Sequence, residues 1–184
     1  LALGAAMRST GRLYAFDVSG HRLDALKPRM ARSGLSNVHP LAIAHERDDR
    51  IKRLSGKIDR VLVDAPCSGL GTLRRNPDLK WRQKPEGIAD VAATQTAILD
   101  SAARLLKSGG RLVYATCSVL PQENEDIADA FSKSHPDFVA LPVVDELTRL
   151  KVANAQSLCH GDFLRLWPHR QGTDGFFAAV WVRK

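Results

Sequence analysis

Two cysteines, each placed directly after an apolar strand-like run, are the residues of this chain best suited to chemistry. Cys67 lies in the motif DAPCSG after the run RVLV, and Cys117 lies in ATCS after the run RLVY. The carboxyl ends of strands in an open α/β sheet form the edge where ligands bind. We therefore expect the two thiols to converge on one substrate atom, with one thiolate attacking and the other group handling protons.

Carboxylates accompany these thiols at the ends of strand-like runs. Asp64 adds a charge and a hydrogen-bond acceptor beside Cys67, and Pro66 stiffens the strand end. A single cysteine in such a turn is commonly a buried structural residue, but a second one in a like position favours chemistry. Asp17 ends an earlier run, where an acidic residue either holds the hydroxyls of a nucleoside ribose or caps the following helix.

A basic segment, RRNPDLKWR, follows the first cysteine motif. Arg74, Arg75 and Lys80 can bind phosphates, and Trp81 can stack on a base. Charge runs are commonly solvated loops, but the position directly after the candidate active-site strand favours a binding role. The net charge of +7 favours a polyanionic partner, of which nucleic acid is the commonest, although a basic enzyme without such a partner is the alternative.

The elements that must position these residues alternate between strand and helix, which predicts βαβ units and a largely parallel sheet. Strands are expected at 12–18, 38–43, 59–64, 111–116, 138–144 and 176–182, and helices at 19–33, 86–106 and 122–134. The run 59–64 is typical of a buried parallel strand, and the sequence SGG at 108–110 is expected to end a helix. Glu123 and Glu125 are interpreted as the acidic first turn of the third helix. Residues 145–172 are expected to be irregular.

Composition limits the class of protein. A chain of 184 residues suits one domain. No apolar run approaches the roughly 20 residues that a membrane helix needs, and no signal peptide is evident. The three cysteines, of which Cys159 is the third, form no CxxC pair and no zinc spacing. We therefore expect reduced thiols in the cytoplasm, with no membrane, no disulfide scaffold and no metal site.

These motifs also resemble those of a known family. The segments DAPCSGLGTLRRNPDLKW and YATCSVLPQENE closely resemble two signature motifs of the RNA cytosine-5 methyltransferases of the NOL/NOP/Sun family, and DGFFAA resembles its final motif. The motifs occur in the family's order, and the resemblance extends over residues 1–184. It implies a Rossmann-like α/β methyltransferase fold, S-adenosylmethionine as cofactor, and small-subunit (16S) ribosomal RNA as substrate.

The resemblance also implies a role for each site residue. Cys117 would be the nucleophile, adding to carbon 6 of cytosine so that carbon 5 takes the methyl group. Cys67 would then help to eliminate the enzyme from the methylated base. Asp64 would stabilise the target cytosine close to the cofactor, while Asp17 would hold the cofactor ribose and Arg22 would join the cofactor site. Attack on a ring carbon requires the base to leave its stack.

The chain opens on a helix-like segment, residues 1–8, without the strand and Gly-rich cofactor turn that the resemblance implies. We expect residues 1–184 to be the C-terminal part of a methyltransferase catalytic domain, N-terminally truncated, that works as a monomer with an upstream part of the same protein. Two alternatives stay open: the same chemistry on transfer RNA, and an inactive RNA-binding module. The joint presence of the two cysteines with Asp17 and Asp64 speaks against loss of activity.

Residues 1–184 are expected not to fold alone, because a missing central strand would leave the strands ending at Asp17 and Asp64 with unpaired edges. Buried backbone groups without partners are costly relative to the small net stability of a domain. The isolated chain should show no cooperative thermal unfolding and no micromolar binding of S-adenosylmethionine by calorimetry. A cooperative transition together with such binding would contradict this expectation.

Overall fold

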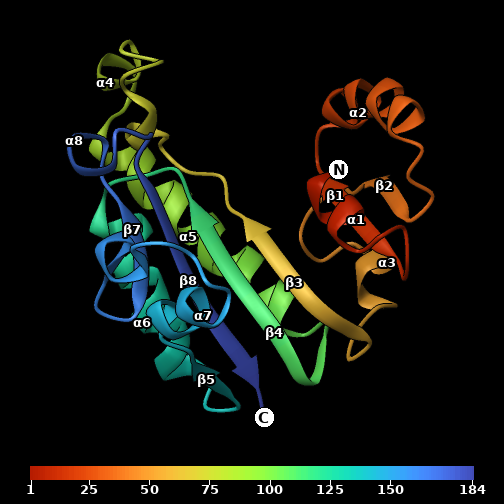
Figure 1. The fold of residues 1–184 in the computed structure, drawn as a ribbon. Coiled ribbons are helices and arrows are strands. Elements are labelled where there is room, and N and C mark those ends of the chain that lie inside the picture. Colours follow the sequence, from red (N-terminus) through yellow and green to blue (C-terminus); the bar gives the residue numbers. More distant parts are fainter. The chain divides into compact units, whose positions relative to one another are not determined.

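The strands of this chain assemble into two separate sheets, one in each of two units. The computed structural model describes residues 1–184, divided into unit 1, Leu1–Arg53, and unit 2, Leu54–Lys184. Most helices and strands of the two units are labelled in Figure 1. No helix is long and apolar enough to cross a membrane.

Unit 1 is a two-stranded parallel sheet with helices. In chain order it contains α1 (Ala2–Ala6), β1 (Leu13–Asp17), α2 (Gly20–Ser33), β2 (Val38–Ala42) and α3 (Asp49–Lys52). The residues that mark the two ends of α2 lie directly beside the helix in the sequence. The Ser19 hydroxyl accepts from the backbone N–H of Arg22 at the start of the helix, and Gly34 ends it in the left-handed region at φ +65°. The predicted helix over 19–33 is confirmed.

Unit 2 holds a six-stranded sheet in which β3, β4, β8, β7 and β6 are neighbours in that order and β5 pairs with β8. The strands are β3 (Ile58–Asp64), β4 (Leu106–Thr116), β5 (Phe138–Ala140), β6 (Cys159–His160), β7 (Phe163–Leu166) and β8 (Phe176–Arg183). Only β3 and β4 pair in parallel. The prediction of a largely parallel sheet is therefore wrong for this unit, because β8 runs antiparallel to β4, β5 and β7, and β6 and β7 form a hairpin.

Helices pack on this sheet around one hydrophobic core. They are α4 (Leu79–Arg82), α5 (Pro85–Ala103), α6 (Glu125–Ser134), α7 (Val143–Arg149) and α8 (Pro168–Gln171). The helix α5 packs on β3, β4 and α6 (Figure 1). Large side chains from these elements are almost fully buried: Leu99, Leu106, Leu112, Tyr114, Phe131, Phe177 and Trp181. Burial of this apolar surface is what fixes the ends of β3 and β4.

The connection between α5 and β4 differs from the prediction. The helix ends at Ala103, and β4 already begins at Leu106, so the SGG segment lies inside the strand. Gly109 adopts φ +74°, and the pairing with β3 shifts register between Ile58 and Arg60. The glycines thus lie at an irregularity of the β3–β4 pairing, where Gly109 takes a left-handed conformation, rather than at a helix end.

Other expectations need correction in unit 2. Residues 145–172 are not irregular, because they include most of α7, the 3₁₀ helix η3 (Ala155–Leu158), β6, β7 and α8. The strand expected over 138–144 ends at Ala140, and α7 begins after Pro142. The run 59–64 is not a fully buried strand. It pairs with β4 alone, and its burial alternates between the two faces: Val63 is buried, whereas Arg60 and Leu62 are exposed, Leu62 by 52%.

Candidate active site

The two predicted cysteines lie in contact. Because β3 and β4 are parallel and pair Asp64 with Ala115, the chains leave the sheet side by side at their carboxyl ends. The next residue, Ala65, continues the pairing through its N–H to the Ala115 carbonyl at 3.0 Å. Cys67 and Cys117 follow, both half-buried and free, with their sulfur atoms 3.3 Å apart. The sheet register thus brings the two thiols together.

The contact between the two thiols gives them different pKa values. The hydrogen bond from Cys67 lowers the pKa of Cys117 to about 7, even though burial acts in the opposite direction. The pKa of Cys67 is raised well above its ordinary value by the same hydrogen bond, by burial and by the charge on Cys117. Because its pKa is the higher of the two, Cys67 keeps its proton and donates a hydrogen bond to Cys117. The pair can therefore present a Cys117 thiolate near neutral pH.

A buried carboxylate that sequence reasoning misplaced lies behind the thiols. The helix predicted over 122–134 is divided at Asn124, so Glu123 lies in the 3₁₀ helix η2 (Pro121–Glu123) and Glu125 in the first turn of α6. Glu123 is 0% exposed there. Ser68 and Ser118, the residues that directly follow the two cysteines, both donate hydroxyl hydrogen bonds to it. The only signal in the sequence is its closeness to the second cysteine motif.

Two glycines join the three sequence motifs. The backbone N–H of Gly71 donates to the Cys117 carbonyl at 2.9 Å, and that of Gly175 donates to the Gly71 carbonyl at 2.8 Å. A Cβ at Gly71 would lie 2.6 Å from the Cys117 carbonyl oxygen and closer still to that of Gly175. Only glycine permits this approach of three backbones, so the DGFFAA segment supports both cysteine loops.

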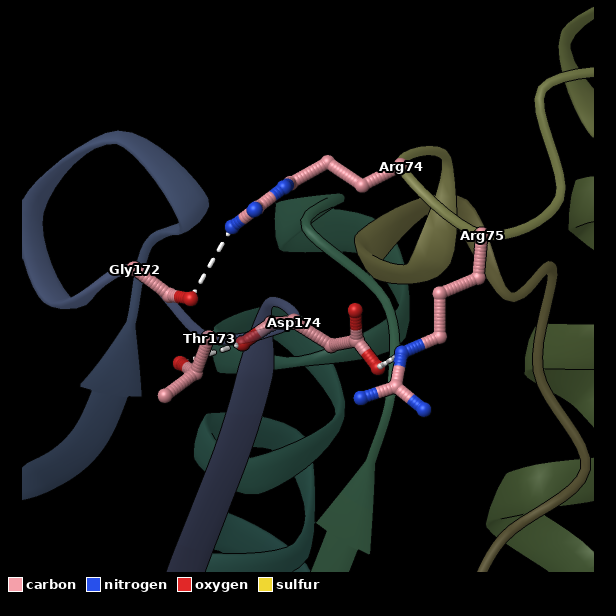
Figure 2. A pocket seen from close by; sticks show the side chains of 5 residues that line it. All are labelled: Arg74, Arg75, Gly172, Thr173 and Asp174. Atoms are coloured by element: carbon pink, nitrogen blue, oxygen red, sulfur yellow. Dashed lines mark hydrogen bonds and ion pairs between the residues drawn. The ribbon is translucent and has the colours of Figure 1, made fainter.

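The predicted basic segment has two parts: two arginines that bind the turn before β8, and the short helix α4. Figure 2 shows Arg74 donating to the Gly172 carbonyl, at 2.9 Å, and Arg75 paired with Asp174 at 3.0 Å, around a pocket of about 160 Å³. Both arginines hold the turn that precedes β8, and their remaining N–H groups are available to an anion.

The exposed part of this segment is α4. Trp81 is 80% exposed there, with the Lys80 ammonium 5.0 Å from its ring centroid. An exposed aromatic ring beside a cation can stack on a base while the cation contacts phosphate.

The predicted cofactor residues lie in both units. In unit 1, one carboxylate oxygen of Asp17 accepts from the Ser19 N–H at 2.8 Å, and the other lies 3.7 Å from the Arg22 guanidinium. Asp17 thus helps to form the turn before α2 and still presents an acceptor oxygen, which fits a ribose hydroxyl. In unit 2, Asp64 ends β3 with an exposed side chain.

Comparison with known proteins places these motifs in one family. Residues 2–182 match the family described as 16S rRNA methyltransferase RsmB/F. The chain belongs to this family. This membership confirms the resemblance inferred from the motifs.

A probable ribosomal RNA small subunit methyltransferase B from Synechocystis sp. is 40% identical over 94% of this chain, which spans 38% of that relative. The crystal structure of PH0851 is 36% identical with a TM-score of 0.87, over 98% of this chain and 39% of that one. NSun6 from Pyrococcus horikoshii, solved with SFG, is 25% identical with a TM-score of 0.75, over 98% of this chain and 44% of that one. The predicted Rossmann-like α/β class is confirmed.

Alkylation of Cys117 should follow the protonation of the thiol pair. In the full-length protein, the rate of Cys117 modification by iodoacetamide should rise with pH through a midpoint near 7, because the thiolate is the reactive form. Cys67→Ala removes the hydrogen-bond donor and should move the midpoint upward toward that of an ordinary thiol. Mass spectrometry of the Cys117 peptide measures the rate.

Cys159→Ala is the matched control, because Cys159 lies in β6, and it should leave the midpoint unchanged. An equal midpoint in wild type and Cys67→Ala would show that the contact between the thiols does not set the acidity of Cys117.

Proposed function

We propose that this protein methylates carbon 5 of a cytosine in RNA, with S-adenosylmethionine as methyl donor and Cys117 as covalent nucleophile. The observation that carries the proposal is the pair of free thiols, 3.3 Å apart, of which one is acidic and the other retains its proton. Addition to an aromatic ring carbon needs a soft nucleophile, and the later elimination needs a group that takes the proton from carbon 5; Cys117 and Cys67 are placed for these two roles. The family description favours 16S ribosomal RNA as substrate.

The cofactor would be held by carboxylates at strand ends. In unit 1, the Asp17 oxygen that lies 3.7 Å from the Arg22 guanidinium would bind the ribose hydroxyls, with Arg22 beside it in the first turn of α2. In unit 2, Asp64 would lie close to the methyl donor. A relative of this chain, NSun6, has been solved with SFG, an analogue of S-adenosylmethionine. When bound, the cofactor supplies the methyl group.

The first chemical step uses the Cys117 thiolate. Its sulfur forms a bond to carbon 6 of the cytosine, and the electrons of the 5,6 double bond move toward carbon 5, which takes the methyl group. Asp64, exposed at the end of β3, would accept a hydrogen bond from the target base and keep it oriented. Access to carbon 6 requires the base to leave its stack.

The second step uses Cys67. Once Cys117 is bonded to carbon, it no longer accepts a hydrogen bond or carries charge, so two of the three causes that raise the pKa of Cys67 are gone. Cys67 then loses its proton to solvent more easily, and its thiolate can take the proton from carbon 5. The carbon–sulfur bond breaks, the double bond re-forms, and the electron pair returns to the Cys117 sulfur.

RNA would be held by the basic segment. Trp81 and Lys80 on α4 offer a stacking surface and a phosphate contact, and Arg74 and Arg75 line a small pocket with free N–H groups. Modification of transfer RNA by the same chemistry remains the alternative substrate. An inactive binding module is disfavoured by the intact thiol pair, since binding alone needs neither thiol.

Substitution of each cysteine should separate the two steps. Cys117→Ala in the full-length protein should abolish methyl transfer, because no carbon–sulfur bond can form. Cys67→Ala should accumulate a covalent RNA adduct, because elimination lacks its proton acceptor. Both variants are incubated with RNA and S-adenosylmethionine and run on a denaturing gel. An adduct with Cys117→Ala and none with Cys67→Ala would reverse the assignment.

Neutralising the basic segment should change the salt dependence of RNA binding. Replacing Arg74, Arg75 and Lys80 with Gln should weaken binding and reduce the slope of log affinity against log salt by about one unit per lost phosphate contact. The arginines also hold the 172–174 turn, so Lys80→Gln is measured separately as a variant that leaves this turn intact. It should reduce the slope of log affinity against log salt by up to about one unit.

The matched control for these variants is a triple Gln variant of Arg29, Lys133 and Lys151, which removes the same charge from other helices and the segment after α7. Its slope should stay closer to that of the wild type. Equal slopes in the wild type and the Arg74, Arg75 and Lys80 variant would rule out phosphate contacts at the basic segment.

A further inference from the structure

The Glu123 carboxylate has neutral hydrogen-bond donors on both of its oxygens. Oε1 accepts from the Ser68 N–H at 2.7 Å and from the Gln95 amide at 3.4 Å. Oε2 accepts from the Ser68 hydroxyl at 2.5 Å and from the Ser118 hydroxyl. None of these partners carries a positive charge. All four residues are buried, with Gln95, Ser118 and Glu123 at 0% exposure.

The backbone around Glu123 is itself fixed to β4. The Tyr114 hydroxyl donates to the Glu123 carbonyl at 2.7 Å. The neighbouring Asn124 accepts from the Thr116 hydroxyl at 2.5 Å and donates to the Ser118 carbonyl at 3.1 Å. These hydrogen bonds hold the carboxylate at a fixed position relative to β4, the strand that precedes Cys117. The same carboxylate binds Ser68 in the loop that carries Cys67.

Loss of any of these hydrogen-bond donors would destabilise the buried carboxylate. Moving a carboxylate from water into the protein interior costs free energy unless its oxygens accept hydrogen bonds there. Loss of even one of these hydrogen bonds restores a large part of that cost. Separation of the two cysteine loops would take Ser68 or Ser118 away from the ion. The penalty opposes that movement, so the distance between the thiols is held by a group that touches neither of them.

We propose that Glu123 is the positioning residue of the thiol pair: by binding Ser68 and Ser118 together, it holds Cys67 against Cys117. The importance of this role for catalysis rests on the proposed function, but the role itself concerns only the geometry of the two loops. No substrate or cofactor atom needs to touch Glu123, which is wholly buried.

The charge of Glu123 also acts on the acidity of Cys117. The groups that act on this thiol come from three elements: Cys67 after β3 lowers its pKa, while Asp64 at the end of β3 and Glu123 in η2 raise it. Replacement of Glu123 by Gln keeps an acceptor for the Ser68 N–H and lets the two serine hydroxyls rotate to accept from the new amide. Gln should thus keep the geometry while removing the charge.

The geometry can be tested with phenylarsine oxide, which condenses with two closely spaced thiols and releases one water. One equivalent should bind tightly to the Cys67–Cys117 pair of the full-length protein, as measured by titration and by mass spectrometry. Glu123→Ala should weaken this binding by about a hundredfold, because a second thiol held in place contributes roughly 10²–10⁴ in effective affinity. Glu123→Gln should restore it.

The charge is tested by the pH profile of Cys117 alkylation, whose midpoint should fall in Glu123→Gln relative to the wild type. Glu146→Gln is the matched control, because Glu146 ties Arg111 to Arg149 and touches neither cysteine loop. It should change neither the arsenical affinity nor the midpoint. If Glu123→Ala does not fold, Ser118→Ala removes one donor to the carboxylate and should weaken arsenical binding by itself.

Undiminished arsenical binding in Glu123→Ala, or in Ser118→Ala where the first variant does not fold, would overturn the positioning role. Loss of binding in Glu123→Gln as large as in Glu123→Ala would also overturn it. Neither assay uses RNA or S-adenosylmethionine, so a failure of the proposed methylation would leave these results intact. The two proposals can therefore fail separately.

Discussion

The buried carboxylate of Glu123 is the constraint on which the rest of the candidate site depends. It accepts hydrogen bonds from the residues that follow both cysteines, and it has no cation to neutralise it. An ion in this position is stable only while its neutral donors stay in place. The need to keep it satisfied therefore links the end of β3 to the end of β4 beyond the last backbone pair of the sheet. Two thiols with different acidities are the chemical result of that link.

Close backbone packing supports the same loops from the other side. Gly71 and Gly175 allow the loop after Cys67, the loop after Cys117 and the turn before β8 to meet through backbone hydrogen bonds. The arginines of the basic segment fasten that turn further through Gly172 and Asp174. The residues proposed to contact RNA are thus part of the support for the cysteines. If the basic segment binds RNA as proposed, substrate binding and the geometry of the thiols are coupled through one small region of unit 2.

The sheet of unit 2 explains why the site can be both rigid and accessible. Its core buries Tyr114 and Leu112 of β4 completely, which fixes the strand that delivers Cys117. The neighbouring strand β3 has β4 as its only partner and leaves Asp64 exposed at its end. A firmly held thiol beside an accessible carboxylate suits the proposed reaction, in which the base must enter from solvent. In unit 1, Asp17 likewise lies at the end of a strand, with one carboxylate oxygen bound to the Ser19 N–H and the other 3.7 Å from the Arg22 guanidinium.

The sequence by itself determined the features that depend on neighbouring residues. Ser19 and Gly34 bound α2, the apolar runs predict the strands that end at Asp64 and Thr116, and the motifs identify the family. The tertiary structure decided what depends on distant residues meeting. Glu123 binds a serine 55 residues away, and Arg74 binds a carbonyl 98 residues away. Local pattern placed Glu123 in the first turn of a helix, with no sign that its carboxylate is buried, and placed the SGG segment at a helix end. Whether a polar side chain is buried, or a glycine is needed for space, is fixed only when separate segments pack together, and no local pattern carries that information.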